Sequence, residues 1–410
     1  MPKFLTLDDL GEVRGKTLLI RPDFNVPIHP ETKEILDDTR IRAHAITIKE
    51  LSDKGARIII IVHQGRPGQP DFIESLKGHA KKLSEILGKP VKYVNDLYGN
   101  EAKSAIKELN NGEILLLKNV RTFPEERKKK SPEEHAQSEF VKELAPLFDA
   151  FILDGFSVAH RSHASVVGFA AVLPTYAGRV MERELKALTR VLEDPQKPVV
   201  VVLGGAKAEK TIKIIDFFLG NNIADNVLTG GLVGLLFLLS RGIDLGNPTV
   251  ENLKKKGLYD LVVPAKELLE KYKERIKYPT DFAIEENGGR KEIQMNYLPV
   301  DKPIYDIGEK TSSEYESIIK NAKTIIACGP LGVYEKDKFI KGTQKVFEAI
   351  AKSKAYSLAG GGDTVAALKK LGLLNAFSYV SLAGGAFIEF ISGGKLPGVE
   401  VLEMWYRKLK

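Results

Sequence analysis

The chain has 410 residues, more than one ordinary hydrophobic core accommodates, so we expect two domains. Its composition is that of a globular protein and excludes a fibrous or low-complexity chain. The formal charge of +7 permits nucleic acid, a membrane surface or phosphorylated metabolites as partners, without choosing among them.

The single cysteine, Cys328, excludes an internal disulfide framework and fits a reducing cytosol. The first ten residues lack the apolar core of a signal peptide, and the longest apolar stretch, 228–239, is too short to span a bilayer. We therefore expect a cytoplasmic protein. Few methionines and many lysines and glutamates favour a thermophilic source.

The first half of the chain alternates apolar runs with amphipathic segments. The expected strands are Thr17–Arg21, Arg57–His63, Val91–Val94, Glu113–Lys118 and Ala150–Leu153. The expected helices are Ile41–Leu51, Gly78–Leu87, Ala102–Leu109 and Pro132–Leu147. Because strands that alternate with helices form parallel βαβ units, this half predicts a doubly wound parallel sheet.

A polar helix, Gly178–Leu192, connects this half to a second alternating series. The strands expected there are Val199–Leu203, Asn226–Thr229, Leu261–Val263, Thr324–Cys328, Ala355–Leu358 and Tyr379–Val380. Segment 266–300 resembles a surface excursion or hairpin. The sequence thus predicts an α/β protein with two doubly wound parallel-sheet domains, 1–174 and 175–394, joined by a hinge helix.

Polar residues follow the strands of the first half, where a doubly wound sheet binds its ligands. The candidates are Asp23, Asn25, Arg40, His63, Arg66, Arg121, Arg161 and His163, together with Gly65 between His63 and Arg66. Because arginine forks bind phosphate and carboxylate bidentately, four arginines at one rim indicate a small, multiply anionic ligand. Asp23 and Asn25 could accept hydrogen bonds from its hydroxyl, or they could form an Asx turn. Any one of these arginines could instead form a surface ion pair.

Glycines follow the strands of the second half. The candidate nucleotide-binding residues are Gly204, Gly205, Lys207, Gly230, Gly231, Glu335, Gly361, Gly362, Asp363 and Thr364. Backbone N–H groups at such loops and helix starts can cradle phosphates, and Asp363 could hold Mg²⁺ on them. Tight structural turns and an exposed helix-start glutamate are the alternatives. A metabolite site and a nucleotide site on separate domains indicate phosphoryl transfer with closure to exclude water.

The motifs in this order resemble phosphoglycerate kinases over essentially the whole chain. They are RPDFNVP (21–27), HQGRP (63–67), 154–163, GGAK (204–207), DIGEKT (306–311), GPLGVYE (329–335), GGGDT (360–364) and 381–389. The resemblance implies two Rossmann-like domains with a hinge, and a C-terminal segment, 395–410, that packs back on the first domain. It also implies reversible, Mg²⁺-dependent transfer of phosphoryl between 1,3-bisphosphoglycerate and ADP, in line and in a closed interdomain cleft, as a step of glycolysis and gluconeogenesis.

The resemblance also implies roles for individual residues. Asp23, Asn25, Arg40, His63, Gly65, Arg66, Arg121 and Arg161 would bind phosphoglycerate, and the candidate residues of the second half would bind ATP or ADP. Arg40 and Lys207 would be catalytic, and Asp363 would hold Mg²⁺. A monomer and a homodimer are both compatible with the sequence.

The chain departs from the family pattern at several positions. Thr211 stands where a second lysine is usual, with Lys210 beside it, and Ala327-Cys328 replaces Trp-Asn. Near the C-terminus Ser-Leu-Ala-Gly-Gly (381–385) replaces Ser-Thr-Gly-Gly-Gly, and Glu309 replaces a proline. These departures indicate a divergent branch of the family, with an archaeal branch as a candidate.

Two other classes of protein fit the sequence less well. A nucleic-acid-binding protein would cluster lysines and arginines with aromatic residues, whereas these arginines are dispersed among Asp, Asn, His and Gly. A dehydrogenase on a similar fold would show a G-x-G-x-x-G after a strand with an acidic residue downstream, and none is present; a nucleotide-dependent ligase is the remaining alternative.

Overall fold

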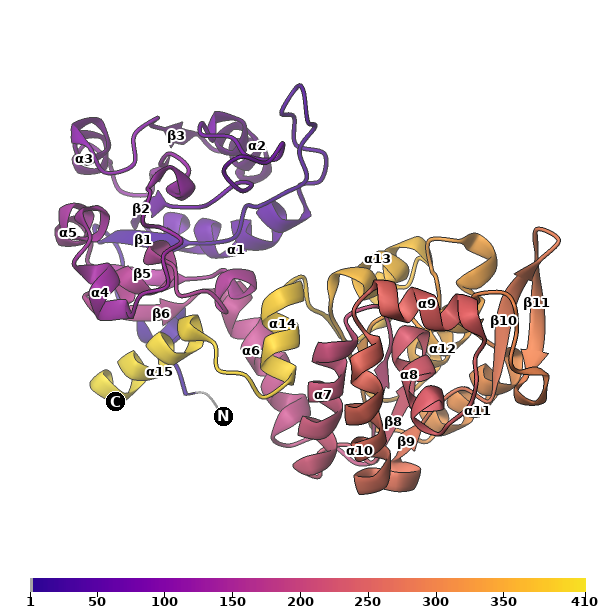
Figure 1. Cartoon of the computed structure of the whole chain (residues 1–410). Coiled ribbons are helices and arrows are strands. Elements are labelled where there is room, and N and C mark those ends of the chain that lie inside the picture. Colours follow the sequence, from indigo (N-terminus) through magenta and orange to yellow (C-terminus); the bar gives the residue numbers. More distant parts are fainter. Residues whose placement is uncertain (1–2) are drawn as a thin grey trace. The chain divides into compact units, whose positions relative to one another are not determined.

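A computed structural model describes residues 3–410 (Figure 1). The chain divides into two compact units, one of residues up to Lys186 together with Lys395–Lys410, and one of Ala187–Gly394. Among residues 3–410, no helix is both long enough and apolar enough to cross a membrane.

The first unit is built on a six-stranded parallel sheet in the order β3-β4-β2-β1-β5-β6. Its strands are β1 (Thr17–Arg21), β2 (Arg57–Ile60), β3 (Val91–Tyr93), β4 (Ile114–Leu116), β5 (Ala150–Leu153) and β6 (Thr175–Ala177). All five residues of β1 are buried, as expected of a central strand with both faces covered. The parallel sheet predicted for this half is therefore present, with β6 as an additional edge strand.

Helices cover this sheet and complete the unit. They are α1 (Thr39–Asp53), α2 (Lys77–Leu87), α3 (Asn100–Lys107), α4 (Pro132–Ala136), α5 (Glu139–Leu144) and α15 (Pro397–Leu409). The single helix expected over 132–147 is wrong: it is broken between α4 and α5, where Gln137 ends one helix and Ser138 begins the next. At the C-terminus, α15 packs on β6, and Trp405 Nε1 donates to the carbonyl of Ala170 at 2.6 Å.

The second unit is built on another six-stranded parallel sheet, in the order β15-β14-β13-β7-β8-β9. Its strands are β7 (Val199–Leu203), β8 (Asn226–Thr229), β9 (Ile276–Lys277), β13 (Thr324–Cys328), β14 (Tyr356–Ala359) and β15 (Tyr379–Val380). The strand expected at Leu261–Val263 is wrong, because these residues lead into helix α10 (Val262–Tyr272), where Val263 is 64% exposed. The edge position of the sheet is filled by β9.

Most of the remaining helices of this part of the chain follow its strands; the exceptions are the connecting helix α6 and α9, which comes after α8. They are α6 (Arg179–Leu192), α7 (Ala208–Gly220), α8 (Gly231–Ser240), α9 (Asn247–Lys255), α11 (Glu309–Lys320), α12 (Lys341–Lys352), α13 (Gly362–Lys370) and α14 (Gly384–Ile391). A small antiparallel sheet joins β10 (Asp281–Glu286), β11 (Gly289–Gln294) and β12 (Ile304–Ile307). The hairpin expected within 266–300 is present as β10 and β11, whereas α10 and β9 belong to the body of the unit.

Candidate active site

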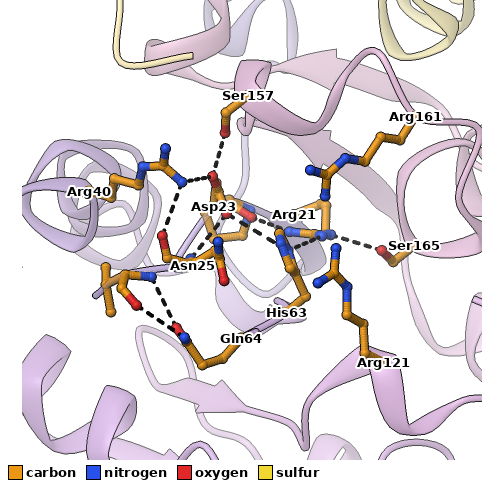
Figure 2. A network of polar contacts seen from close by, with 12 residues as sticks. Arg21, Asp23, Asn25, Arg40, His63, Gln64, Arg121, Ser157, Arg161 and Ser165 are labelled. Atoms are coloured by element: carbon orange, nitrogen blue, oxygen red, sulfur yellow. Dashed lines mark hydrogen bonds and ion pairs between the residues drawn. The ribbon is translucent and has the colours of Figure 1, made fainter. Parts of the chain in front are cut away.

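Figure 2 shows that polar residues predicted after β1, β2, β4 and β5 come together in the first unit. Each lies at the carboxyl end of a strand or at the start of the following segment: Asp23 and Asn25 after β1, His63 after β2, Arg121 after β4 and Arg161 after β5. Arg40 reaches the same place from the second position of α1. Parallel strands end on one edge of the sheet, so residues distant in sequence become neighbours there.

Asp23 is the centre of this group. The residue as a whole is 2% exposed, and its carboxylate accepts hydrogen bonds from Arg40 Nη1 at 2.8 Å and from Ser157 Oγ at 2.5 Å, both at Oδ2. Burial opposes ionisation of Asp23, but Arg40, the Ser157 hydroxyl and Arg21 more than offset burial and hold its pKa well below the ordinary value. An ionised Asp23 therefore holds Arg40 in place.

Asn25 has its acceptor oxygens occupied by the protein. Its side-chain Oδ1 accepts from the backbone N–H of Gly65 at 2.8 Å, and its carbonyl accepts from Arg40 Nη1 at 3.0 Å. Its own N–H donates to Asp23 Oδ1 at 3.1 Å, so the Asx turn considered from the sequence is present. Asn25 thus connects the loops after β1 and β2.

Gly65 is required by the backbone. Its φ is +67°, and a Cβ at this position would lie 2.1 Å from the carbonyl oxygen of Asp71. The carbonyl of Gly65 accepts a hydrogen bond from Arg121 Nη1. Only glycine allows the loop after β2 to pass this closely while orienting Arg121.

Three arginines bring more positive charge than the buried carboxylates around them balance. Figure 2 shows the guanidinium groups of Arg21, Arg121 and Arg161 directed toward one another. Burial lowers the pKa of all three, with that of Arg121 falling to about 10, and the charge of Arg161 lowers the pKa of Arg21 and Arg121 further. Arg121 Nε and Arg161 Nη1 are buried and have no hydrogen-bond partner in the protein. Buried donors of this kind cost free energy unless a ligand accepts from them, and an anion is the ligand that would suit these positively charged donors.

The two histidines do not add to this charge. Burial lowers the pKa of His63 well below 6.5, and it lowers the pKa of His163 to about 3. His63 Nδ1 lies 3.1 Å from Arg21 Nη2, and because arginine can only donate, this nitrogen acts as the acceptor. Neutral His63 thus orients Arg21.

Arg66 lies at the edge of the site and is exposed. In addition to burial, the positive charge of Arg66 lowers the pKa of Arg161, because the two guanidinium groups repel each other.

Several residues of the site had not been singled out from the sequence. Arg21 is the last residue of β1 and is 1% exposed, so the rule that pointed to Asp23 could have found it. Ser157 lies in a 3-10 turn within the motif 154–163, which drew attention only to Arg161 and His163. Ser165 lies in a short π-helix and Glu126 in a turn, and no motif or spacing marks these two.

The second unit carries the predicted glycine loops at the carboxyl ends of β7, β8 and β14. Gly205, Gly231 and Gly361 have φ of +78°, +55° and +95°, which an L side chain rarely adopts. A Cβ on Gly204 would lie 2.1 Å from the carbonyl oxygen of Pro330, and one on Gly230 would lie 2.7 Å from the Leu331 side chain. These glycines are thus required by the packing of neighbouring loops.

A cavity of about 370 Å³ opens beside these loops. Gly205, Gly231, Glu335 and Asp363 line it together with apolar residues such as Leu235 and Leu331. An apolar cavity with a few polar groups at its edge is the usual form of a small-molecule site. The predicted Glu335 and Asp363 therefore border the same space.

A smaller cavity of about 30 Å³ lies at the starts of α7 and α13. Residues 204–207, 210–211, 328–329 and 361–364 contribute to its lining. Lys207 is the residue that immediately precedes α7. Thr364 is structural as well, because its buried Oγ1 accepts from the N–H of Gly329 at 2.7 Å.

Thr211 and Cys328, two of the positions that depart from the family pattern, line this smaller cavity, and so does Lys210. Thr211 Oγ1 donates to the carbonyl of Lys207 at 3.2 Å, and Lys210 Nζ lies 2.9 Å from Glu389 Oε2. Burial raises the pKa of Cys328 to about 12, so its thiol is neutral. Thr211 occupies the place of the family's second lysine but is uncharged. The neighbouring Lys210 is therefore the one of these two residues that carries a positive charge.

Mg²⁺ fits the chemistry of this region. Within residues 3–410, no three His, Cys, Asp or Glu side chains gather as a metal site would need. Asp363, in the first turn of α13, supplies one carboxylate to both cavities. Because Mg²⁺ is commonly bound by one or two carboxylates plus substrate phosphates, a single carboxylate beside free helix N–H groups suits it.

Known proteins with similar sequences and the same fold identify the family. The family model described as phosphoglycerate kinase matches residues 7–394. The phosphoglycerate kinase of Methanobacterium bryantii is 46% identical over 399 residues and that of Methanothermobacter thermautotrophicus 46% over 401; each alignment covers 97% or more of both chains. The crystal structure of phosphoglycerate kinase from Pyrococcus horikoshii is similar with a TM-score of 0.89 and 40% identity, covering 99% of this chain and 100% of that one. The structure from Coxiella burnetii gives 0.84 and 34%, covering 98% and 99%. The chain therefore belongs to the phosphoglycerate kinase family.

Proposed function

We propose that this protein catalyses the reversible, Mg²⁺-dependent transfer of a phosphoryl group between ATP and the carboxylate of 3-phosphoglycerate. The observation that carries the proposal is the buried arginine cluster of the first unit, with unpartnered donors on Arg121 and Arg161. Such donors call for an anion of high charge, and 3-phosphoglycerate supplies a phosphate and a carboxylate.

In the first unit we assign the phosphate to the arginine cluster. Arg121, Arg161 and the exposed Arg66 would donate to its oxygens, and neutral His63 would keep Arg21 directed into the same space. Arg40, anchored to Asp23, would lie at the reacting carboxylate, where negative charge builds up during transfer. Asp23, Asn25 and Gly65 support these groups through the hydrogen bonds that connect their loops.

In the second unit we assign ATP or ADP to the glycine-lined cavity. The base and ribose would occupy the larger cavity, with Glu335 as acceptor for the ribose hydroxyls. The phosphates would approach the backbone at Gly204, Gly205, Gly230, Gly231, Gly361 and Gly362, near Thr364. Asp363 would hold Mg²⁺, whose positive charge neutralises the phosphate oxygens when it is bound.

Lys207 is the remaining cationic group for the transferring phosphoryl. It precedes α7 beside the phosphate-binding glycines, as a group that acts through charge alone requires. Phosphoryl transfer depends on positioning and charge neutralisation, so no nucleophilic side chain is needed. Closure of the two domains around their ligands stays a prediction.

The partners follow from the reaction. We propose that the positively charged side chains of the protein bind small phosphorylated metabolites rather than nucleic acid. We also propose a cytoplasmic location.

A coupled assay tests the proposal. Purified protein should form ADP from ATP only when 3-phosphoglycerate and Mg²⁺ are both present, and omission of either should stop the reaction. A folded protein that shows no turnover with all three components, or the same ATP hydrolysis without 3-phosphoglycerate, would contradict it.

A further inference from the structure

Arg21 is held from behind by a buried chain of hydrogen bonds. Its Nε donates to Ser165 Oγ at 2.9 Å, its Nη1 donates to the carbonyl of Pro22, and its Nη2 faces His63 Nδ1. Arg21 is 1% exposed and Ser165 is fully buried. The plane of the guanidinium group is therefore fixed by the protein before any ligand binds.

The chain continues from Ser165 to Glu126. Because Ser165 Oγ accepts from Arg21, its one proton is directed to another acceptor, and it donates to Glu126 Oε1 at 2.6 Å. The backbone N–H of Ser165 donates to the other oxygen, Oε2, at 2.9 Å. Both oxygens of Glu126 accept hydrogen bonds, so the ionised carboxylate fits this geometry, and protonation would displace one of the two donors.

Glu126 also brings a buried carboxyl group close to the arginine cluster, where it acts on Arg21 and Arg121. Glu126 is 1% exposed. Burial raises its pKa, and the positive charges of Arg21 and Arg121 oppose this rise. His163 Nδ1 lies 3.7 Å from Oε1, and its low pKa keeps this neighbour neutral. A buried carboxylate is costly, so a residue that served packing alone would be better replaced by an apolar one.

We propose that Glu126 and Ser165 are positioning residues that orient Arg21 toward the phosphate of the bound substrate. The inference rests on the proposed function, because it assigns these two residues to the same site. Neither reaches the substrate itself: Ser165 acts on the Nε side of Arg21, and Glu126 acts through Ser165.

The test is a double-mutant cycle on the affinity for 3-phosphoglycerate. We would measure the dissociation constant by isothermal titration calorimetry at pH 8 for the wild type, Glu126→Gln, Ser165→Ala and the double variant. Each single variant should weaken binding about tenfold, because each breaks one charge-assisted connection to Arg21. The double variant should also be about tenfold weaker rather than a hundredfold, because the two residues act in series.

Two controls separate this effect from loss of structure. Glu125→Gln removes the same charge at the neighbouring position, where the side chain pairs with Lys128 and Lys130 near the surface, and should leave the affinity unchanged. Trp405 is the one tryptophan of the chain and packs in the first unit, so its fluorescence during urea unfolding reports whether each variant is folded there. If Glu126→Gln does not fold, Ser165→Ala, which removes one hydroxyl, gives the decisive comparison.

The possible results separate the two proposals. If the wild type binds 3-phosphoglycerate and either single variant binds it equally well, or if the double variant multiplies the two effects, the positioning role is wrong while the proposed function stands. If the folded wild type does not bind 3-phosphoglycerate at all, both proposals fall.

Discussion

Arg40 donates from Nη1 to Oδ2 of Asp23 at 2.8 Å, and the two side chains differ in exposure: 34% for Arg40 and 3% for Asp23. The carboxylate is thus a buried anchor, while part of the guanidinium group can face a ligand. An arginine held in this way needs little reorganisation when charge develops beside it.

The first prediction follows from this pair. Arg40→Ala should lower kcat by about a hundredfold or more, since it removes a preorganised donor from the transition state. Arg42→Ala is the matched control, because Arg42 lies on the same helix, pairs with Asp38 and is 61% exposed. Steady-state kinetics that show a change in KM alone for Arg40→Ala would reduce its role to ground-state binding.

Asp363 provides a second prediction. Asp363→Asn should raise the Mg²⁺ concentration needed for half-maximal activity by about tenfold, because a neutral amide is a poorer Mg²⁺ ligand than a carboxylate. The control is Asp337→Asn, an exposed residue that pairs with Lys370, the last residue of α13. Identical Mg²⁺ titrations of the wild type and Asp363→Asn would exclude this carboxylate as the metal ligand.

A third prediction concerns the stability of the second unit. Arg290, on β11, pairs with Asp306 through Nη1 and Oδ2 at 2.6 Å, and burial raises the pKa of Asp306 to about 6 even though Arg290 opposes this. Arg290→Ala should lower the free energy of unfolding by about 3–5 kcal/mol, because it leaves a buried carboxylate without its partner. Lys291→Ala, next to it and exposed, should change little.

Urea denaturation followed by circular dichroism measures this change. The fluorescence of Trp405 serves as an internal reference for the first unit. Adding Asp306→Asn to Arg290→Ala should restore part of the loss, and a double variant less stable than Arg290→Ala would show that the pair is not the cause.

Glu126 makes the stability of the first unit depend on pH. Burial raises its pKa to about 7, against 4.5 for an ordinary glutamate, in spite of Arg21 and Arg121. Below about pH 4.5 the carboxyl is protonated in the folded and the unfolded chain. Between 4.5 and 7 only the unfolded chain ionises, so this group's stabilising contribution is lost as pH rises through 7, by about 3 kcal/mol in all.

The comparison with Glu126→Gln isolates this contribution. Unfolding in urea at several pH values, followed by Trp405 fluorescence, should show the wild type losing stability relative to the variant from pH 5 to pH 8. A difference between the two proteins that does not change with pH would mean that Glu126 titrates at its ordinary value.

The fold could be predicted where the sequence carries a strong pattern. Val199–Leu203 is a run of apolar, mostly β-branched residues, and it forms β7 with every residue buried. Leu261–Val263 could not be assigned in this way, because three apolar residues fit a strand and a helix equally well, and the sequence that follows continues as α10. The two-residue β9 is too short to show a period at all.

The part of the candidate site that follows the strand ends could be predicted from the sequence. Asp23, His63 and Arg161 lie together because parallel strands end on one edge, which alternation of strands and helices already implies. Glu126 and Ser165 could not be found, because they come from irregular segments 39 residues apart that only the folded chain brings into contact.

The affinity for 3-phosphoglycerate tests the central claim most directly, namely that the buried arginine cluster binds the substrate's phosphate. Isothermal titration calorimetry should show that Arg161→Ala binds 3-phosphoglycerate about a hundredfold more weakly than the wild type, since it removes a charged donor from a buried site. The affinity of the same variant for Mg²⁺-ATP should not change. Equal affinities of Arg161→Ala and the wild type for 3-phosphoglycerate would contradict the account.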